Sequence, residues 1–219
     1  MVELIDFSKK PSLLCDFVAE MRHVEIQGDR MRFRRNIERT GEIIAYEISK
    51  KLSYREQSIP SPLGMAEGLR LDQKVVIGTI LRAGLPFHHG FLSYFDRAEN
   101  AFVSAYRKYK DALRFDIHVE YIACPDLTDK VLILTDPMLA TGSSMEMAYR
   151  ALCTKGIPSE LHIASVIASR PAIEYLENHL PKEQKITIWT AALDEALNEH
   201  SYIVPGLGDA GDLAYGEKL

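Results

Sequence analysis

Residues 131–145 read Val-Leu-Ile-Leu-Thr-Asp-Pro-Met-Leu-Ala-Thr-Gly-Ser-Ser-Met, and the rest of the chain is interpreted around them. The four apolar residues at the start are typical of a strand buried on both faces of a parallel sheet. Pro137 and Gly142 interrupt regular structure, and residues 145–155 favour a helix that Gly156 ends. A strand, a polar loop and a helix in this order bring backbone N–H groups and a helix N-terminus together, which favours anion binding.

The polar residues of this loop suit a phosphorylated sugar. Gly142 allows the backbone to approach a phosphate, and Thr141, Ser143 and Ser144 add hydroxyl donors. The carboxylate of Asp136 has the wrong charge for a phosphate ligand, so we expect it to bind sugar hydroxyls or a metal.

Helix capping is the alternative explanation for the same hydroxyl groups. Ser143 and Glu146 match the capping box S-x-x-E, in which the hydroxyls would only cap a helix. Capping is compatible with anion binding, but alone it explains neither the Asp-Pro pair at residues 136–137 nor the Ala-Thr-Gly run. Anion binding is therefore the favoured interpretation.

The composition is that of an ordinary soluble globular chain and predicts one domain over residues 1–219. Of the 219 residues, 47% are apolar and 26% are charged. No segment approaches the roughly 18 apolar residues of a membrane span, and the N-terminal residues lack the basic region and apolar run expected of a secretory signal. Three cysteines without a C-x-x-C pair favour reduced thiols in the cytoplasm. A net charge of −5 argues against nucleic acid as the main partner.

Two further predicted strands lead to an arginine. Residues 74–81 favour a strand that ends at Arg82, beside a glycine that permits unusual dihedrals. Residues 101–105 favour a short strand followed by Arg107. Ligands of open α/β sheets bind beyond the carboxyl ends of the strands. Two arginines and the Asp136 loop in this relation indicate one anionic ligand.

Three other segments bear on the architecture. Residues 29–52 favour a long helix whose arginine-rich face suits a solvated surface, with pairs such as Arg34–Glu38, better than an anionic effector site. Residues 58–69 contain prolines and glycines and favour a loop or a short hairpin. Residues 108–130 alternate weakly, and a lid over the site and a plain surface hairpin fit them equally.

Residues 161–168 and 185–191 add two strands, with a helix between them that starts near Pro171. The pattern predicts an α/β fold with a mainly parallel five-stranded sheet flanked by helices. Residues 206–211 match G-x-G-x-x-G, but the eight residues after Gly211 leave no room for the helix and acidic residue of a dinucleotide site. No spacing of His and Cys supports a metal site.

Residues 136–144 resemble the phosphoribosyl-diphosphate (PRPP) motif of phosphoribosyltransferases, in the form with Asp before Pro that is typical of uracil phosphoribosyltransferases. The resemblance extends to residues 80–84, 106–107 and 202–212 and covers nearly the whole chain. It implies the phosphoribosyltransferase-like fold, with a small C-terminal hood and a hairpin-like lid. It also implies transfer of the phosphoribosyl group of PRPP to uracil, giving UMP and diphosphate in pyrimidine salvage.

The resemblance also implies the site residues. The catalytic residues would be Arg82 and Arg107 at the diphosphate, Asp136 at the ribose hydroxyls, and Asp209 close to PRPP. Besides these four, the PRPP contacts would be Pro137, Met138, Leu139, Ala140, Thr141, Gly142, Ser143 and Ser144, and the uracil contacts Ile203, Gly208, Asp209 and Ala210. Mg²⁺ as cofactor, a homodimer or higher homo-oligomer, and a possible GTP effector follow from the same resemblance.

Two other functions compete with this enzyme. A regulator that senses PRPP or UMP would keep the pocket without turnover, but intact Arg82, Arg107 and Asp136 favour the enzyme. The tail at residues 202–212 argues against a phosphoribosyltransferase for another base. The chain departs from the family pattern at Pro86, His89, Ser143 and residues 108–110, which bears on affinity, lid and effector response more than on the reaction.

Overall fold

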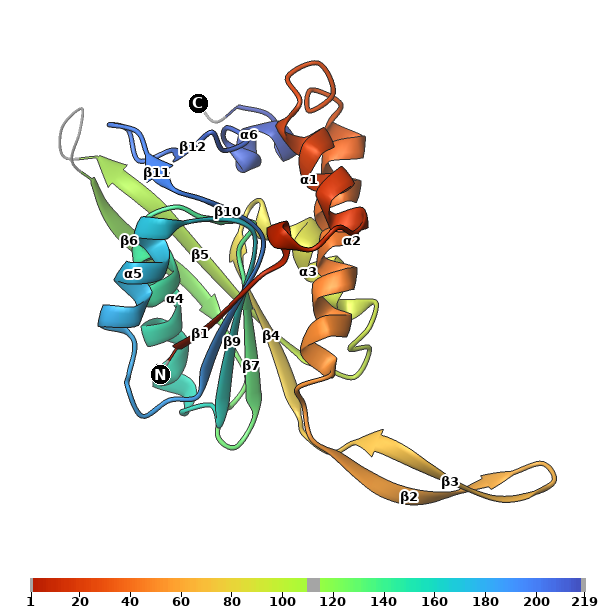
Figure 1. Ribbon diagram of the computed structural model, residues 1–219. Coiled ribbons are helices and arrows are strands. Elements are labelled where there is room, and N and C mark those ends of the chain that lie inside the picture. Colours follow the sequence, from red (N-terminus) through yellow and green to blue (C-terminus); the bar gives the residue numbers. More distant parts are fainter. Residues whose placement is uncertain (1, 110–114, 218–219) are drawn as a thin grey trace.

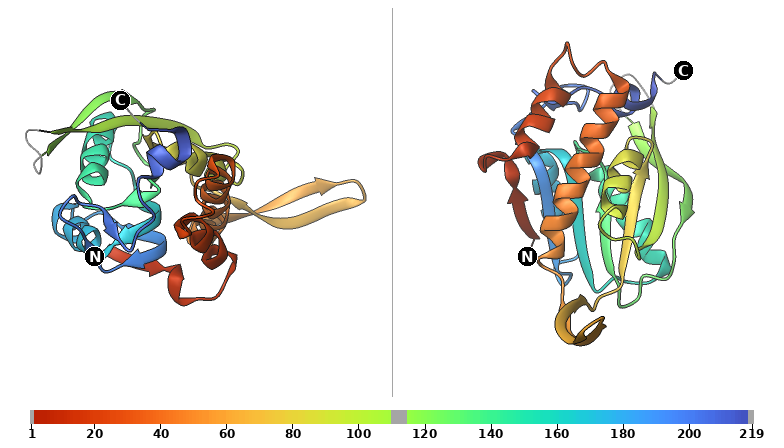
Figure 2. Two further views of the ribbon diagram at one scale, coloured as in Figure 1. Left: turned by 90° about the horizontal axis from the view of Figure 1, so that it is seen from above. Right: turned by 90° about the vertical axis from the view of Figure 1, so that its right-hand side faces the viewer.

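The chain is seen in a computed structural model that describes residues 2–109 and 115–217. One central sheet separates two layers of helices, as Figures 1 and 2 show from three directions. Its strands pair in parallel except for β5 and β6, which confirms the predicted α/β class with a mainly parallel sheet. In spatial order the strands are β1 (Val2–Asp6), β10 (Ile186–Asp194), β9 (Glu160–Ser169), β7 (Val131–Thr135), β4 (Val75–Leu81), β5 (Glu99–Tyr109) and β6 (Phe115–Ala123).

The sheet has eight strands and is therefore wider than the five expected. β1 adds in parallel beside β10 at one edge, and β6 adds antiparallel beside β5 at the other. The two-residue strand β8 (Met138–Leu139) pairs with β9. Edge strands are exposed on one side and can be short and mixed in polarity, so their sequence pattern is weak.

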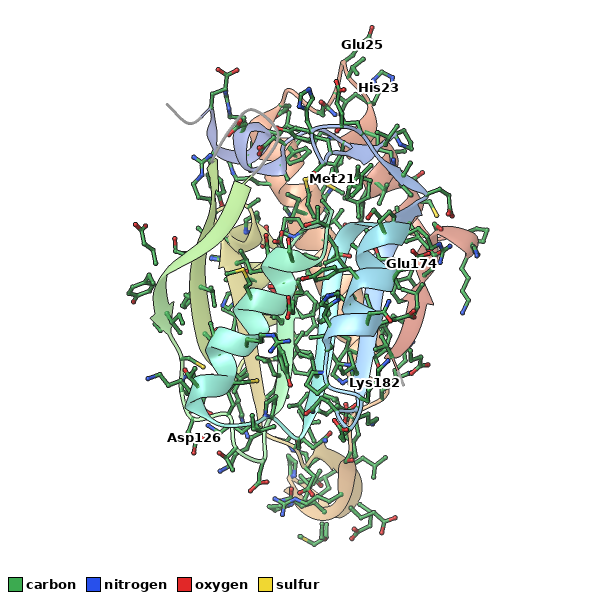
Figure 3. The ribbon with its side chains drawn as sticks, turned by 90° about the vertical axis from the view of Figure 1, so that its left-hand side faces the viewer. Met21, His23, Glu25, Asp126, Glu174 and Lys182 are labelled. Atoms are coloured by element: carbon green, nitrogen blue, oxygen red, sulfur yellow. The ribbon has the colours of Figure 1, made fainter. Side chains whose placement is uncertain are left out.

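The middle strands are apolar because helices cover both of their faces. Every residue of β7 and of β9 is buried. On one face lie α4 (Ser143–Leu152) and α5 (Arg170–His179), the two helices nearest the viewer in Figure 3. On the other face lie α1 (Leu13–Arg22), α2 (Arg30–Ser49) and α3 (Gly84–Leu92), so that the apolar core forms one cluster on each side.

Helix α2 confirms the predicted long helix but not its predicted ion pairs. Its apolar stripe, which includes Phe33 and Ile44, is buried. Arg35, rather than Arg34, binds Glu38, at 2.9 Å. The Arg34–Glu38 prediction was wrong because Arg34 turns toward a distant segment that helical periodicity cannot reveal.

The predicted short hairpin is a long two-stranded arm. Strands β2 (Tyr54–Ser61) and β3 (Gly64–Leu71) pair antiparallel along their whole lengths. Figure 1 shows that this arm points away from the end of the sheet where β4 begins. Most of its residues are exposed, and Leu63 at the turn is 101% exposed.

Strand β5 is longer than predicted and changes the position of Arg107. The strand extends through Tyr109, and Arg107 pairs in register with Ile117 of β6. The prediction that Arg107 follows the strand was therefore wrong, because pairing with β6 prolongs β5. The predicted lid corresponds to the β5–β6 hairpin, whose tip at residues 110–114 lies outside the described part of the chain.

The structure also bears on membrane-spanning segments and on the cysteines. Within residues 2–109 and 115–217, no helix combines the length and the apolar character needed to cross a membrane. All three cysteines, Cys15, Cys124 and Cys153, are free thiols.

Candidate functional site

Several predicted site residues meet at the carboxyl edge of the sheet. Leu81, the last residue of β4, pairs with Ser104, and Thr135, the last of β7, pairs with Ala164. Arg82 and Asp136 directly follow these two strands and therefore lie at the same edge. The C-terminal segment passes over this edge in Figure 1, as expected for a hood.

The loop after β7 leads into α4 through a left-handed residue. Gly142 is the N-cap of α4, has φ of +82°, and no side chain caps the helix. Ser143 is already the first helical residue, and its hydroxyl lies 2.7 Å from that of Thr141. The capping-box interpretation was therefore wrong. The N-terminus of α4 carries two hydroxyls and no side-chain cap, which suits a phosphate.

Strand β9 holds the first half of this loop. The N–H groups of Val166 and Ile167 donate to the carbonyl of Pro137 at 3.1 and 3.0 Å. The carboxylate of Asp136 accepts from the N–H of Met138 at 3.1 Å, so one of its oxygens helps to shape the loop.

Helix α5 holds the second half of the loop. The Ser169 hydroxyl donates to the carbonyl of Ala140 at 2.5 Å and accepts from the N–H of Ala172 at 3.0 Å. Tyr175 donates to Glu146 of α4 at 2.8 Å, and burial together with this bond raises the pKa of Tyr175. Sequence reasoning missed Ser169, although its place at the carboxyl end of a strand was a usable signal.

Two glycines at this edge are required for different reasons. A Cβ on Gly142 would lie 3.0 Å from the carbonyl of Ala172, in addition to the strain of its positive φ. Gly84 has no positive φ, so the expectation of unusual dihedrals was wrong there. A Cβ on Gly84 would instead overlap the hydroxyl of Thr79, so only glycine lets α3 start so close to β4.

The two predicted arginines differ in how the structure presents them. Nη2 of Arg82 lies 3.2 Å from Oδ1 of Asp212 and 3.4 Å from the carbonyl of Gly216, so Arg82 joins the strand edge to the tail. Its side chain is 42% exposed. Ser104 of β5 pairs with Leu81, the last residue of β4, and the backbone of Arg107 lies farther along β5. The side chain of Arg107 lies outside the described part of the structure.

The tail comprises β11 (Ala196–Leu197), β12 (Ile203–Val204) and α6 (Ala210–Tyr215). Asp209 is the N-cap of α6 and accepts from the N–H of Asp212 at 3.0 Å. The helix α6 has six residues and starts inside the glycine motif rather than after it. It belongs to no strand–helix–strand unit among the described residues, in agreement with the exclusion of a dinucleotide site.

The proposed uracil contacts divide between buried and exposed positions. Ile203 and Ala210 are 4% and 2% exposed, and their side chains pack in the core, which fixes the tail. Gly208 is exposed and has φ of +89°, a conformation that favours glycine.

Residues far away in the sequence anchor this tail, and sequence reasoning missed them. Arg34 donates to the carbonyl of Ala214 at 2.7 Å. Asp194 accepts from Arg22 and from the N–H of Gly206. Asp194 ends β10, so the carboxyl-edge rule could have found it had the strand been predicted to its full length.

A pocket of about 320 Å³ lies between the tail and the α1–α2 connection. A larger pocket of about 930 Å³ lies at the base of the arm. Its lining includes Val75 and Glu99, the first residues of β4 and β5, so it lies at the opposite end of the sheet. Only the smaller pocket includes predicted site residues, and it is lined by Gln27, Gly28, Arg30, Gly208, Asp209, Asp212, Leu213 and Glu217.

The described residues contain no cluster of three His, Cys, Asp or Glu side chains that could hold a metal ion by themselves. His88, one of the two adjacent histidines, is buried and lies 2.8 Å from Oδ1 of Asn100. Burial lowers the pKa of His88 despite this hydrogen bond, so a neutral, structural imidazole is indicated.

A mainly parallel sheet, an Asp-Pro loop before an uncapped helix, and a hood over the carboxyl edge define a protein of the phosphoribosyltransferase class. Residues 9–217 match the family model described as uracil phosphoribosyltransferase. The chain belongs to the uracil phosphoribosyltransferase family. It is a pentosyltransferase of pyrimidine salvage, which transfers the phosphoribosyl group of PRPP to uracil.

Individual relatives agree with the family assignment. The chain is 66% identical over 218 residues to a uracil phosphoribosyltransferase of Porphyromonas gingivalis, with 100% of both chains covered. It is 38% identical over 190 residues to one of Methanothermobacter thermautotrophicus, covering 86% of this chain and 85% of the relative. A solved structure from Aquifex aeolicus superposes with a TM-score of 0.85 at 28% identity, covering 97% of this chain and 98% of that one.

Proposed function

We propose that the transfer takes place at the carboxyl edge of the sheet, with PRPP on the loop of residues 136–144 and uracil under the tail. The observation that carries this proposal is the N-terminus of α4, which has no side-chain cap and has the hydroxyls of Thr141 and Ser143 beside it. Residues 140–144 would cradle the 5′-phosphate, and Asp136 would accept hydrogen bonds from the ribose hydroxyls.

The proposed reaction needs no covalent nucleophile. N1 of uracil forms a bond to C1 of the ribose while the bond from C1 to the diphosphate oxygen breaks, through a transition state with oxocarbenium character. N1 loses its proton and diphosphate leaves with the bonding electron pair. Catalysis then rests on positioning and on stabilising the leaving group, the proposed role of Arg82 and Arg107.

We propose Mg²⁺ as the cofactor, which would neutralise charge on the diphosphate. This ion is usually held by substrate phosphates, water and one or two carboxylates, so a protein cage of three or more ligands is not required. The carboxylates of Asp136 and Asp209 at this edge fit that need. Chelation with EDTA should abolish UMP formation, and added Mg²⁺ should restore it.

The tail would read uracil through its backbone at Ile203 and residues 208–210. Uracil presents a donor at N3 between two acceptors, whereas cytosine presents an acceptor at N3 and a donor amine at position 4. A side-chain amide can flip to fit either pattern, but backbone groups in a fixed loop cannot. Cytosine would leave buried groups unpaired, a mismatch that can reach about 10⁴-fold in discrimination.

Formation of UMP from labelled uracil, PRPP and Mg²⁺ tests this proposal, with cytosine and hypoxanthine as competitors. We expect strong preference for uracil, and Ile203→Val should keep that preference because it leaves the backbone unchanged. Comparable use of either competitor would contradict the assignment of the tail. PRPP binding without any product would favour the sensing regulator instead.

We also propose that residues 1–219 form one domain, that the protein is cytoplasmic, and that it assembles as a homodimer or higher homo-oligomer. GTP is proposed as an effector, as the family resemblance implies. Analytical ultracentrifugation gives the assembly state. Rates with and without GTP test the effector, and equal rates would contradict it.

A further inference from the structure

A largely buried ion pair anchors the turn of the tail. Nη1 and Nη2 of Arg22 donate to Oδ2 and Oδ1 of Asp194, each at 2.8 Å. The two side chains are 24% and 8% exposed. Two parallel N–H···O bonds between a guanidinium and a carboxylate fix orientation as well as distance. The last residue of α1 is thereby joined to the carboxyl end of β10.

Both members of the pair also bind Gly206. Its N–H donates to Oδ2 of Asp194 at 2.9 Å, and its carbonyl accepts from Nη1 of Arg22 at 3.1 Å. Gly206 has φ of +61°, and a Cβ there would overlap the carbonyl of Ile203. The pair therefore holds both backbone polar groups of one residue in a tightly folded turn.

The position of Gly206 gives this arrangement its importance. Gly206 lies between Ile203 and Gly208, two of the residues proposed to contact uracil. A second contact supports the same turn, because the amide of Gln27 donates to the carbonyls of Met21 at 2.9 Å and Leu207 at 3.3 Å. Met21 lies directly below the α1–α2 connection in Figure 3.

The PRPP loop is held by different residues. β9 and the Ser169 hydroxyl hold it, whereas the side chains of Arg22 and Asp194 bind Gly206. Ser169 is the backbone partner of Asp194 in the pairing of β9 with β10, and this pairing does not depend on the Asp194 side chain. A displacement of the Gly206 turn should therefore change the uracil contacts while leaving the phosphate cradle in place.

We propose that Arg22 and Asp194 are positioning residues for uracil: they touch no substrate, but fix the height and angle of the turn whose backbone reads the base. The inference rests on the function proposed above for the tail. Backbone N–H and C=O groups that bind the base cannot exchange places. The fit of uracil therefore depends on the position in which the turn is held.

Asp194→Asn is the direct test, because it keeps the shape of the side chain and removes its charge. Glu20→Gln is the matched control: Glu20 also accepts two bonds from an arginine, Arg32, but this pair joins α1 to α2 and does not touch the tail. We expect Asp194→Asn to raise KM for uracil on the order of 10-fold, the effect of one weakened charge-assisted hydrogen bond. KM for PRPP should not change, discrimination against cytosine should fall, and Glu20→Gln should alter none of these.

Arg22→Lys gives a second, milder variant. Lysine keeps the charge but cannot form the two-pronged contact with Asp194 while also reaching Gly206. KM for uracil should rise less than in Asp194→Asn, again without a change for PRPP. Circular dichroism and thermal unfolding show which variants are folded, and Arg22→Lys remains informative if Asp194→Asn does not fold.

The outcomes separate the two proposals. Poor discrimination between uracil and cytosine by the unmodified enzyme would overturn the function proposed for the tail. Strong discrimination that Asp194→Asn and Arg22→Lys both leave intact, with KM for uracil unchanged, would overturn only the positioning inference. An equal rise in both KM values, or the same changes in Glu20→Gln, would also overturn it, because a general loss of structure would then explain the effect.

Discussion

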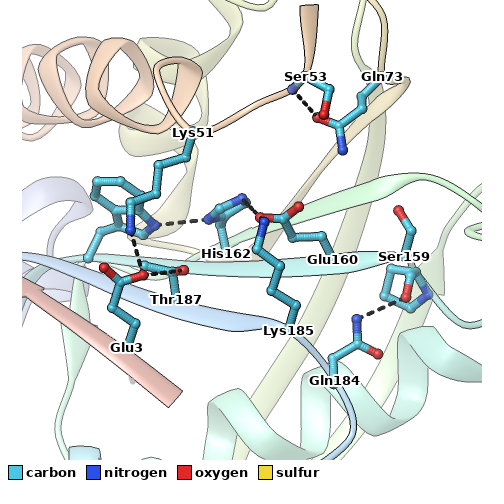
Figure 4. Close-up of polar contacts among 12 residues, drawn as sticks. Glu3, Lys51, Ser53, Gln73, Ser159, Glu160, His162, Gln184, Lys185 and Thr187 are labelled. Carbon is cyan, nitrogen blue, oxygen red and sulfur yellow. Dashed lines mark hydrogen bonds and ion pairs between the residues drawn. The ribbon is translucent and has the colours of Figure 1, made fainter. Parts of the chain in front are cut away.

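The two ends of the central sheet are both polar, but their polar groups serve different purposes. In the amino half, Trp189 donates from Nε1 to Nδ1 of His162 at 3.1 Å. Nε2 of His162 lies 3.1 Å from Oε1 of Glu160, close enough for attraction although not aligned as a hydrogen bond (Figure 4). Nζ of Lys185 lies 2.8 Å from the same oxygen. His162 is fully buried and Glu160 nearly so, whereas Lys185 is 64% exposed, so the network runs from the core to the surface.

At the carboxyl edge Asp136 and the loop hydroxyls are half-buried, Arg82 is exposed, and the N-terminus of α4 has no side-chain cap. There, contacts from β9, Ser169 and Asp194 hold the backbone of the loop and of the tail. The comparison teaches that one sheet can keep stability and chemistry apart: polar groups in the amino half pair with one another, whereas those at the carboxyl edge are the ones proposed to bind the substrates. Substitutions at the two ends should therefore change different quantities.

The largest effect is expected from Arg82→Ala. Loss of a preorganised charge at the leaving diphosphate should raise the barrier by about 2.7–4 kcal/mol, or about 10²–10³-fold in kcat. Thermal stability should change little, since an exposed ion pair such as Arg82–Asp212 contributes little. Steady-state kinetics and calorimetry measure the two. Arg107→Ala should act in the same direction, and unchanged rates in both variants would place the diphosphate elsewhere.

Arg97→Ala is the control at the opposite end of the sheet. Arg97 is an exposed arginine that lines the pocket at the base of the arm. The rate should stay at the wild-type value, which would separate a local role of Arg82 from the loss of any surface cation.

Asp136→Asn should have the next largest effect. The variant keeps the shape and loses charge-assisted hydrogen bonds to the ribose, each worth about 1.5–3 kcal/mol. Turnover should fall roughly 10-fold to 100-fold while Tm hardly moves. A variant that loses stability but retains its specific activity would assign Asp136 to the structure of the loop, in line with its bond to the N–H of Met138.

Trp189→Phe should show the reverse pattern. It leaves the buried Nδ1 of His162 without its donor, which should cost about 1–3 kcal/mol of the free energy of unfolding. In a chain of this size each kcal/mol corresponds to about 2–4 °C in Tm. kcat and both KM values should stay unchanged. A specific loss of turnover would contradict the separation of stability in the amino half from catalysis at the carboxyl edge.

The smallest effect is expected from pH, through Glu160. Burial alone would raise the pKa of Glu160, but its contacts with His162 and Lys185 outweigh burial and lower it to about 2. Because the folded-state pKa lies below the ordinary value of 4.5, the contribution of Glu160 to stability is complete above about pH 4.5 and is lost as pH falls toward about 2. Urea unfolding across this range should show a smaller loss in Glu160→Gln than in the wild-type enzyme.

The parts of the molecule that follow from local pattern were predictable. Strand β7, the buried stripe of α2 and the start of α5 near Pro171 depend on periodicity and on residues close in sequence. Placement of Arg82 and Asp136 at one edge followed from the geometry of parallel strands. The partner of Arg22 could not be predicted in this way, because it lies 172 positions away.

The errors share a physical cause. Arg107 was expected after a short strand, but β5 is prolonged by its pairing with β6, a tertiary effect that propensity does not contain. Ser143 was considered a helix cap, but the left-handed φ of Gly142 starts the helix one residue earlier. In both cases neighbouring backbone, rather than the identity of the residue, decided the local structure.

The position of Trp189 has a spectroscopic consequence. The chain contains one tryptophan, and its indole is buried in the amino half of the sheet. Its emission therefore reports whether the core is intact and is insensitive to events at the carboxyl edge. The fluorescence emission should shift to longer wavelength as the core unfolds. It should remain constant while PRPP or uracil binds at the site, so this one optical signal measures folding without interference from substrate.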